Sequence, residues 1–190
     1  ALIAVFVAFL GLFPFANELY TYVSEPLRSL LPEGSSMIAT EVTSPFLTPF
    51  KLSLVLAVFV AMPVILAQLW GFIAPGLYKS EKRIAIPLLT SSVILFYAGV
   101  AFAYYVVFPL LFGFFTTVGP GDISVMTDIN RYLDFVLKLF FAFGLAFEVP
   151  VAAVILILTG VVTADQLANN RSYVIVGCFV MGMLLTPPDV

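Results

Sequence analysis

The sequence predicts an all-α membrane protein, a polytopic bundle of transmembrane helices, and two observations carry that prediction. Hydrophobic residues make up 62% of the 190 residues and charged residues only 10%, whereas soluble domains carry roughly 25% charged residues. The mean hydropathy is +1.14, and apolar runs of the roughly 20 residues needed to cross a bilayer recur along the chain. We therefore expect a single transmembrane domain over 1–190.

The apolar runs predict five spanning helices, at roughly 1–16, 46–73, 84–112, 131–159 and 171–186. The first run opens without an initiator Met or a basic flank, so we expect 1–15 to be the remaining part of a first spanning helix. The last run stops just before TPPDV, and we expect a further element beyond it. Prolines within or near the ends of these runs predict kinked helices: Pro63, Pro87, Pro109 and Pro150.

The distribution of Lys and Arg predicts the orientation. The short loop 74–83 contains Lys79, Lys82 and Arg83, which the positive-inside rule places in the cytoplasm. Helix counting then places the N-terminus and the loop 160–170 in the cytoplasm, and 17–45 and 113–130 outside. Apolar residues recur at helical spacing in 17–45, which predicts an amphipathic segment on the outer interface, bent or split at Pro26.

Composition also excludes several classes of function. The net charge of −3 gives no reason to expect a nucleic-acid partner. There is no His and only one cysteine, and no phosphate-binding or zinc-protease motif occurs. We therefore expect neither an enzyme active site nor a metal or cofactor. The single cysteine, Cys178, is expected to be a small buried hydrophobic residue.

Glu148 is the only charged residue in the apolar run from Leu139 to Leu158. A carboxylate at this depth costs a few kcal/mol, about 3 on insertion scales, which makes it a functional candidate facing a cavity or the bundle interior. Gly144 and Ala152, one turn away on either side, predict a face that another helix can approach. The structural alternative is a neutral Glu148 that hydrogen-bonds across the bundle, for example to Gln68 or Ser91.

Other polar residues have two interpretations each. Glu81 follows Ser80 and either favours the helix dipole in a first turn or presents an anion that can bind a guanidinium. The spacing of Asp134 and Lys138 predicts an ion pair along one helix. Ser44 before Pro45 predicts an N-cap, and Thr163 with Gln166 predicts a capping box.

Four stretches together carry a family resemblance: SPFLTPFKLS, PVILAQLWGFIAPGLYKSEKR, FAFGLAFEVPV and VMGMLLTPPDV. In this order they resemble the TatC family, the multispanning core of the twin-arginine protein translocase. The similarity covers essentially the whole chain. It implies a cupped bundle of six helices with both termini in the cytoplasm of a bacterial inner membrane, of which five are visible here.

The resemblance also implies a function and a set of site residues. Family members export folded proteins that carry twin-arginine signal peptides, and the proton-motive force drives the export. They work together with single-span TatA-type and TatB-type subunits in a hetero-oligomeric complex that holds several copies of the chain. Matched by motif, Glu81 resembles the acidic residue that receives the arginine pair, with Phe72 and Arg83 beside it. Glu148 resembles the intramembrane glutamate of the concave face, which contacts partners and the inserted signal peptide. Pro26 and Asp189 also match motif positions.

Two other functions remain to be weighed against a signal-peptide receptor. A proton-coupled secondary transporter would use Glu148 as its carrier, and predicts broken helices with several convergent polar groups near the midplane. An assembly scaffold without a receptor role predicts that Glu81 can be replaced without loss.

Overall fold

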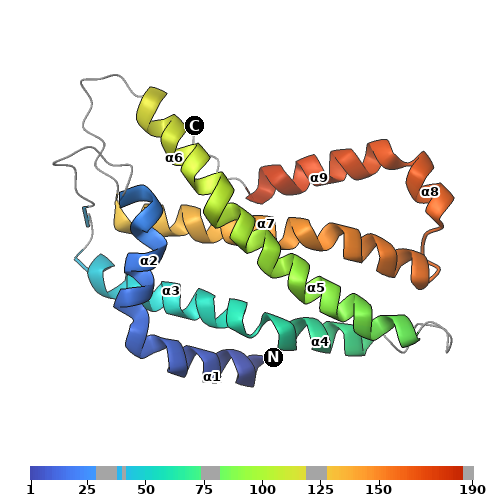
Figure 1. The fold of residues 1–190 in the computed structure, drawn as a ribbon, viewed down its shortest axis with the longest axis horizontal. Helices are drawn as coiled ribbons and strands as arrows, with labels where there is room; N and C mark the ends of the chain where they lie inside the picture. Colours follow the sequence, from blue (N-terminus) through green and yellow to red (C-terminus); the bar gives the residue numbers. More distant parts are fainter. Residues whose placement is uncertain (29–37, 40–41, 74–81, 119–127, 186–190) are drawn as a thin grey trace. The chain divides into compact units, whose positions relative to one another are not determined.

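The computed structural model describes residues 1–28, 38–39, 42–73, 82–118 and 128–185. Within these ranges the regular structure is helical, apart from one isolated β-bridge between Ile38 and Asp128 (Figure 1). The predicted all-α class is therefore confirmed. The chain forms two compact units: Ala1–Met62 with Ala101–Phe140, and Pro63–Val100 with Phe141–Val190.

The first unit opens with one continuous helical stretch. It consists of α1 (Leu2–Leu12), the 3-10 turn η1 (Phe13–Phe15) and α2 (Ala16–Arg28). Pro26 does not split the amphipathic segment, because α2 continues past it to Arg28. A proline leaves the carbonyl four residues earlier without its helical donor. Here that carbonyl belongs to Tyr22, and the Tyr104 hydroxyl donates to it at 3.1 Å.

The other helices of this unit are α3 (Ser44–Val60), the π turn η3 (Ala103–Val107), α6 (Phe108–Val118) and the first turns of α7 (Ile129–Leu158). α3 lies alongside α1 (Figure 1). In η3 the N–H of Phe108 donates to the carbonyl of Ala103, five residues back. This wider turn ends two residues before Pro109, whose ring would crowd a carbonyl one α-helical turn earlier. The helix predicted over 84–112 therefore continues through the proline to Val118.

Aromatic rings form much of the core of the first unit. Phe108 is fully buried and packs against Phe140 with ring centroids 5.2 Å apart. Phe112 packs against Tyr132 at 5.6 Å, and the Tyr132 hydroxyl donates to the carbonyl of Val23 in α2 at 3.0 Å. The tyrosine hydroxyl is satisfied by a backbone acceptor, as a buried polar group requires.

The second unit contains α4 (Met62–Ile73, from Pro63 on), α5 (Lys82–Phe102, as far as Val100), the remaining turns of α7, α8 (Ala164–Asn169) and α9 (Arg171–Leu185). The helix predicted over 46–73 is interrupted at Ala61, because Pro63 has no N–H to donate to a carbonyl one turn earlier. After α7, Gly160 adopts φ 71°, a conformation that favours glycine.

The start of α8 follows the sequence prediction, and the surroundings of Cys178 do not. The side chain of Thr163 accepts from the backbone N–H of Gln166, whose own side chain accepts from Thr163 N–H, so the predicted capping box is confirmed. Cys178 in α9 is exposed, against the expectation of burial, because residues 171–180 of this helix are all exposed in the structure.

Several of the described helices are long and apolar enough to cross a bilayer. By length and composition these are Leu2–Glu25, Ile86–Phe114 and Ile129–Leu158, with a fourth if Ser44–Val60 and Met62–Phe72 are counted as one broken span. The predicted range 171–186 corresponds to α9, in which Arg171–Val180 forms a shorter apolar helix.

Candidate functional site

Glu148 lies in the second unit, where α7 packs against α5. The Ser92 hydroxyl of α5 donates to Glu148 Oε2 at 2.5 Å. The other carboxyl oxygen, Oε1, is buried and has no hydrogen-bond partner among the described residues. The carboxyl group is therefore half satisfied: one oxygen accepts a hydrogen bond, and the other is buried without one.

The hydroxyl that reaches Glu148 differs from the one suggested by the sequence. Ser91 donates to the carbonyl of Leu88 in its own helix at 2.8 Å, and the next residue, Ser92, crosses to α7. Gln68, the other partner suggested, lies on α4 with an exposed side chain. The choice between adjacent serines depends on the rotation of α5 about its axis, which separates neighbouring residues by about 100°.

Two glycines bring α5 and α7 close together beside this bond. A Cβ at Gly144 would lie 2.6 Å from the Phe96 ring, so the absence of a side chain at Gly144 makes room for that ring. A Cβ at Gly99 would overlap the backbone carbonyl of Phe143, so the two backbones nearly touch there. The small-residue face predicted beside Glu148 is thus used at Gly144, whereas Ala152 is exposed.

These contacts define an antiparallel register, because positions that increase along α5 meet positions that decrease along α7. Ser92 meets Glu148, and Phe96 meets Gly144 one turn further along both helices. We call this set of contacts the 92–148 seam, formed by Ser92, Phe96, Gly99, Phe143, Gly144 and Glu148.

Only some of the remaining predicted site residues lie in the part of the chain that the structure describes. Phe72 lies in the last turns of α4 with 86% of its surface exposed. Gln68 is four residues earlier on the same helix and therefore on the same face. Arg83 lies in the first turn of α5, and Pro26 lies in α2. Glu81 and Asp189 lie outside the described residues.

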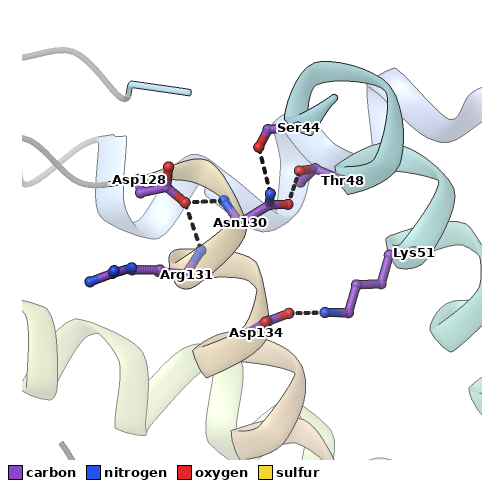
Figure 2. Close-up of polar contacts among 7 residues, drawn as sticks. All are labelled: Ser44, Thr48, Lys51, Asp128, Asn130, Arg131 and Asp134. Carbon is purple, nitrogen blue, oxygen red and sulfur yellow. Dashed lines mark hydrogen bonds and ion pairs between the residues drawn. The ribbon is translucent and has the colours of Figure 1, made fainter. Parts of the chain in front are cut away.

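A polar cluster between α3 and α7 in the first unit was not predicted. Asn130 Nδ2 donates to Ser44 Oγ at 2.5 Å, and Asn130 Oδ1 accepts from Thr48 Oγ1 (Figure 2). Asp128 Oδ1 accepts from the backbone N–H groups of Asn130 and Arg131 at 2.9 and 3.0 Å, which caps α7. Ser44 and Thr48 are fully buried. Their spacing of four residues is a signal in the sequence, since it predicts two hydroxyls on one helix face.

Two local predictions at this end of the helices were wrong. Ser44 is not an N-cap: Thr43 occupies that position without a side-chain cap bond, and the Ser44 hydroxyl is used by Asn130. Asp134 pairs with Lys51 of α3 and not with Lys138 of its own helix (Figure 2). Tertiary packing here brings a lysine from another helix to the carboxylate, which overrides the weak pairing along one helix.

No group of three or more His, Cys, Asp or Glu side chains in the described ranges could hold a metal ion.

Comparison with known proteins assigns the chain to a family. The model of "Sec-independent protein translocase protein (TatC)" matches residues 1–190. The Sec-independent protein translocase protein TatC of Azotobacter chroococcum mcd 1 is 65% identical over 187 residues, which covers 98% of this chain and 73% of that protein. The protein of the same name from Escherichia coli strain K12 is 57% identical over 189 residues, with coverage of 100% and 73%.

A solved structure agrees with these relatives. The crystal structure described as "Twin Arginine Translocase Receptor- TatC" matches with a TM-score of 0.83 and 39% identity, and the match covers 100% of this chain and 83% of that chain. Sequence and fold thus agree over the same residues, and the chain belongs to the TatC family of Sec-independent protein translocase proteins.

Proposed function

We propose that this chain is the signal-peptide receptor and scaffold subunit of a twin-arginine translocase, which exports folded proteins across the bacterial inner membrane using the proton-motive force. The observation that carries the proposal is the match of the family model to all of residues 1–190. The likeness in fold to a structure described as a translocase receptor supports it. The subunit binds and assembles its partners, and we propose no covalent chemistry for it.

Signal-peptide capture is assigned to the cytoplasmic loop between α4 and α5. In the proposal Glu81 binds the arginine pair, because a carboxylate and a guanidinium form paired, charge-assisted hydrogen bonds. Phe72 and Arg83 flank it in the sequence, and the exposed ring of Phe72 offers apolar surface to the peptide. The N-terminus lies in the cytoplasm in this arrangement.

Glu148 and Gln68 form the proposed membrane site for single-span TatA-type and TatB-type subunits and for the inserted signal peptide. The unpartnered Oε1 of Glu148 supports this role, since a buried polar atom without a partner costs free energy that an incoming group would relieve. Pro26 and Asp189 remain proposed functional positions. For Pro26, the bond from Tyr104 to the Tyr22 carbonyl also supports a structural role.

A proton-coupled transporter is favoured less by these observations. Such a transporter needs several polar groups converging on its carrier, whereas the hydrogen bond described for Glu148 comes from a single serine. The family match likewise favours protein translocation.

The receptor role is tested by binding a twin-arginine signal peptide to the full-length protein in detergent. We expect a twin-lysine peptide, or the variant Glu81→Ala, to weaken binding at least about tenfold, because charge-assisted hydrogen bonds are lost. Asp165→Ala is the matched control: it removes an exposed carboxylate from α8, in the other predicted cytoplasmic loop, and leaves the affinity unchanged.

Equal binding of both peptides to the wild type and to Glu81→Ala would exclude Glu81 as the receptor anion and favour a scaffold without a receptor role. An equal loss in Asp165→Ala would show that binding depends on overall charge and not on one site.

A further inference from the structure

We propose that Ser92 is a positioning residue for the Glu148 carboxyl group. In this inference the serine holds Oε2, so that Oε1, which is buried and unpartnered in the chain alone, is the carboxyl atom left to bond a membrane partner once docking uncovers it. The inference rests on the proposed function, because it concerns how the same membrane site is prepared for binding.

The hydrogen bond makes the two oxygens of Glu148 inequivalent. The terminal torsion of a glutamate side chain is broad and nearly two-fold, so a free carboxyl group exchanges its oxygens easily. The Ser92 hydroxyl has one hydrogen to donate, and it donates to Oε2 at 2.5 Å. Oε1 is left buried and without a partner among the described residues. A single fixed donor thus determines which oxygen is left without a partner.

Ser92 belongs to a run of three hydroxyl residues that behave differently. Thr90 donates to the carbonyl of Ile86 at 3.0 Å and Ser91 to that of Leu88 at 2.8 Å, both within their own helix. This is the usual use of such residues in apolar helices. Ser92 alone of the three reaches another helix, and only 1% of its surface is exposed. The two neighbours provide matched controls.

The 92–148 seam keeps the serine within reach. A serine side chain is short, so its bond to another helix requires close backbones. Gly144 accepts the Phe96 ring one turn from Glu148, and Gly99 allows the carbonyl of Phe143 to approach. Phe96 and Gly99 follow Ser92 along α5. Their contacts with α7 fix the separation and the register of the two helices on that side of the serine. The carboxyl group is thereby held before any partner arrives, which lowers the cost of ordering it on binding.

The first test is infrared spectroscopy of the full-length protein in lipid nanodiscs, with glutamate labelled by ¹³C. The band lost in Glu148→Gln identifies the Glu148 carboxyl group. We expect Ser92→Ala to shift this band, since Oε2 loses its donor, and Ser92→Thr to restore it. Thr90→Val and Ser91→Ala should leave it in place. If the band does not move in Ser92→Ala, the proposal is overturned. This result decides the question even if Ser92→Thr does not fold.

The second test measures affinity for a purified single-span TatB-type subunit in the same nanodiscs. We expect Ser92→Ala to weaken binding about fivefold, the effect of one hydrogen bond, and Ser92→Thr to return within about twofold of the wild type. Ser91→Ala should bind as the wild type does. An unchanged affinity in Ser92→Ala, or an equal loss in Ser91→Ala, contradicts the positioning role.

The same samples separate the failure of this inference from that of the proposed function. A wild-type protein that binds neither the twin-arginine peptide nor the single-span subunit would overturn the proposed function, and the infrared result would still decide whether Ser92 holds the carboxyl group. A wild type that binds both, with Ser92→Ala indistinguishable from it, would overturn the inference alone.

Discussion

The polar cluster of the first unit and the 92–148 seam of the second unit both place polar side chains among apolar helices. The two regions differ in how many of these polar atoms have a hydrogen-bond partner. Around Asn130 the side-chain amide binds two buried hydroxyls, one through its nitrogen and one through its oxygen. Around Glu148 one oxygen has a donor and the other has none among the described residues.

This difference teaches what each arrangement contributes to stability. A fully bonded buried network favours one arrangement of its helices, because every alternative leaves a polar atom without a partner. A half-bonded carboxyl group stabilises the protein less, because one of its oxygens is buried without a donor. The first arrangement fixes the junction of α3 and α7, and the second agrees with the membrane site proposed for Glu148.

Separating the two helices of the 92–148 seam should have the largest effect on stability. Gly99→Val should lower the free energy of unfolding by about 3 kcal/mol, the upper end of the range for overpacked cores, because the new side chain meets the carbonyl of Phe143. Thermal unfolding of the full-length protein in detergent measures this. Gly71→Val in α4 is the matched control, since nothing lies within 4 Å of a Cβ there. Equal loss in both variants would mean that the close approach at Gly99 is unimportant.

The closed cluster should be the next most sensitive. Asn130→Ala leaves the buried Ser44 and Thr48 hydroxyls without their partner, and we expect a loss of roughly 2 kcal/mol. The triple variant Ser44→Ala, Thr48→Val, Asn130→Leu removes all the partners together and should recover much of that loss. Thermal unfolding again measures both. If the triple variant is as unstable as the sum of its single changes, the bonds act independently and the cluster is not a network.

The smallest effect on stability is expected at Glu148, and it should have the opposite sign. Glu148→Leu removes a buried oxygen without a partner, and the Ser92 hydroxyl can then donate to a carbonyl of its own helix, as Thr90 and Ser91 do, so the free energy of unfolding should stay the same or rise by about 1 kcal/mol. Export of a twin-arginine reporter protein should be lost in the same variant, because the proposed membrane contact is gone. A destabilised Glu148→Leu protein would show that the carboxyl group is a structural bond between helices, as the alternative interpretation of the sequence holds.

The sequence predicted the class of the fold and the most unusual residue of the site. The apolar runs identified the helical membrane architecture, and the isolation of Glu148 in one such run singled it out. The capping box at Thr163 was also predictable, because its two residues bind each other across one helical turn. These features depend on local spacing or on composition, which a single sequence contains.

The partners of each polar group were not predictable in the same way. Choosing Ser92 over Ser91 requires the rotation of α5 relative to α7, and pairing Asp134 with Lys51 requires the position of α3. Both depend on tertiary packing. The Tyr104 bond to the Tyr22 carbonyl is an intermediate case: Pro26 reveals from the sequence that this carbonyl loses its helical donor, but not which side chain replaces it.

The π turn η3 has a consequence for how this chain tolerates insertions and deletions. Such a turn contains one residue more than an α-helical turn and makes about the same rotation. Deleting one residue of Ala103–Val107 would therefore restore ordinary winding and leave the residues after it facing nearly the same way. The rings of Phe108 and Phe112 would stay against Phe140 and Tyr132, their partners in the core. A deletion within the α-helical turns that follow would instead rotate everything after it by about 100°. The π turn is thus a place where this chain can lose one residue without changing the packing of α6.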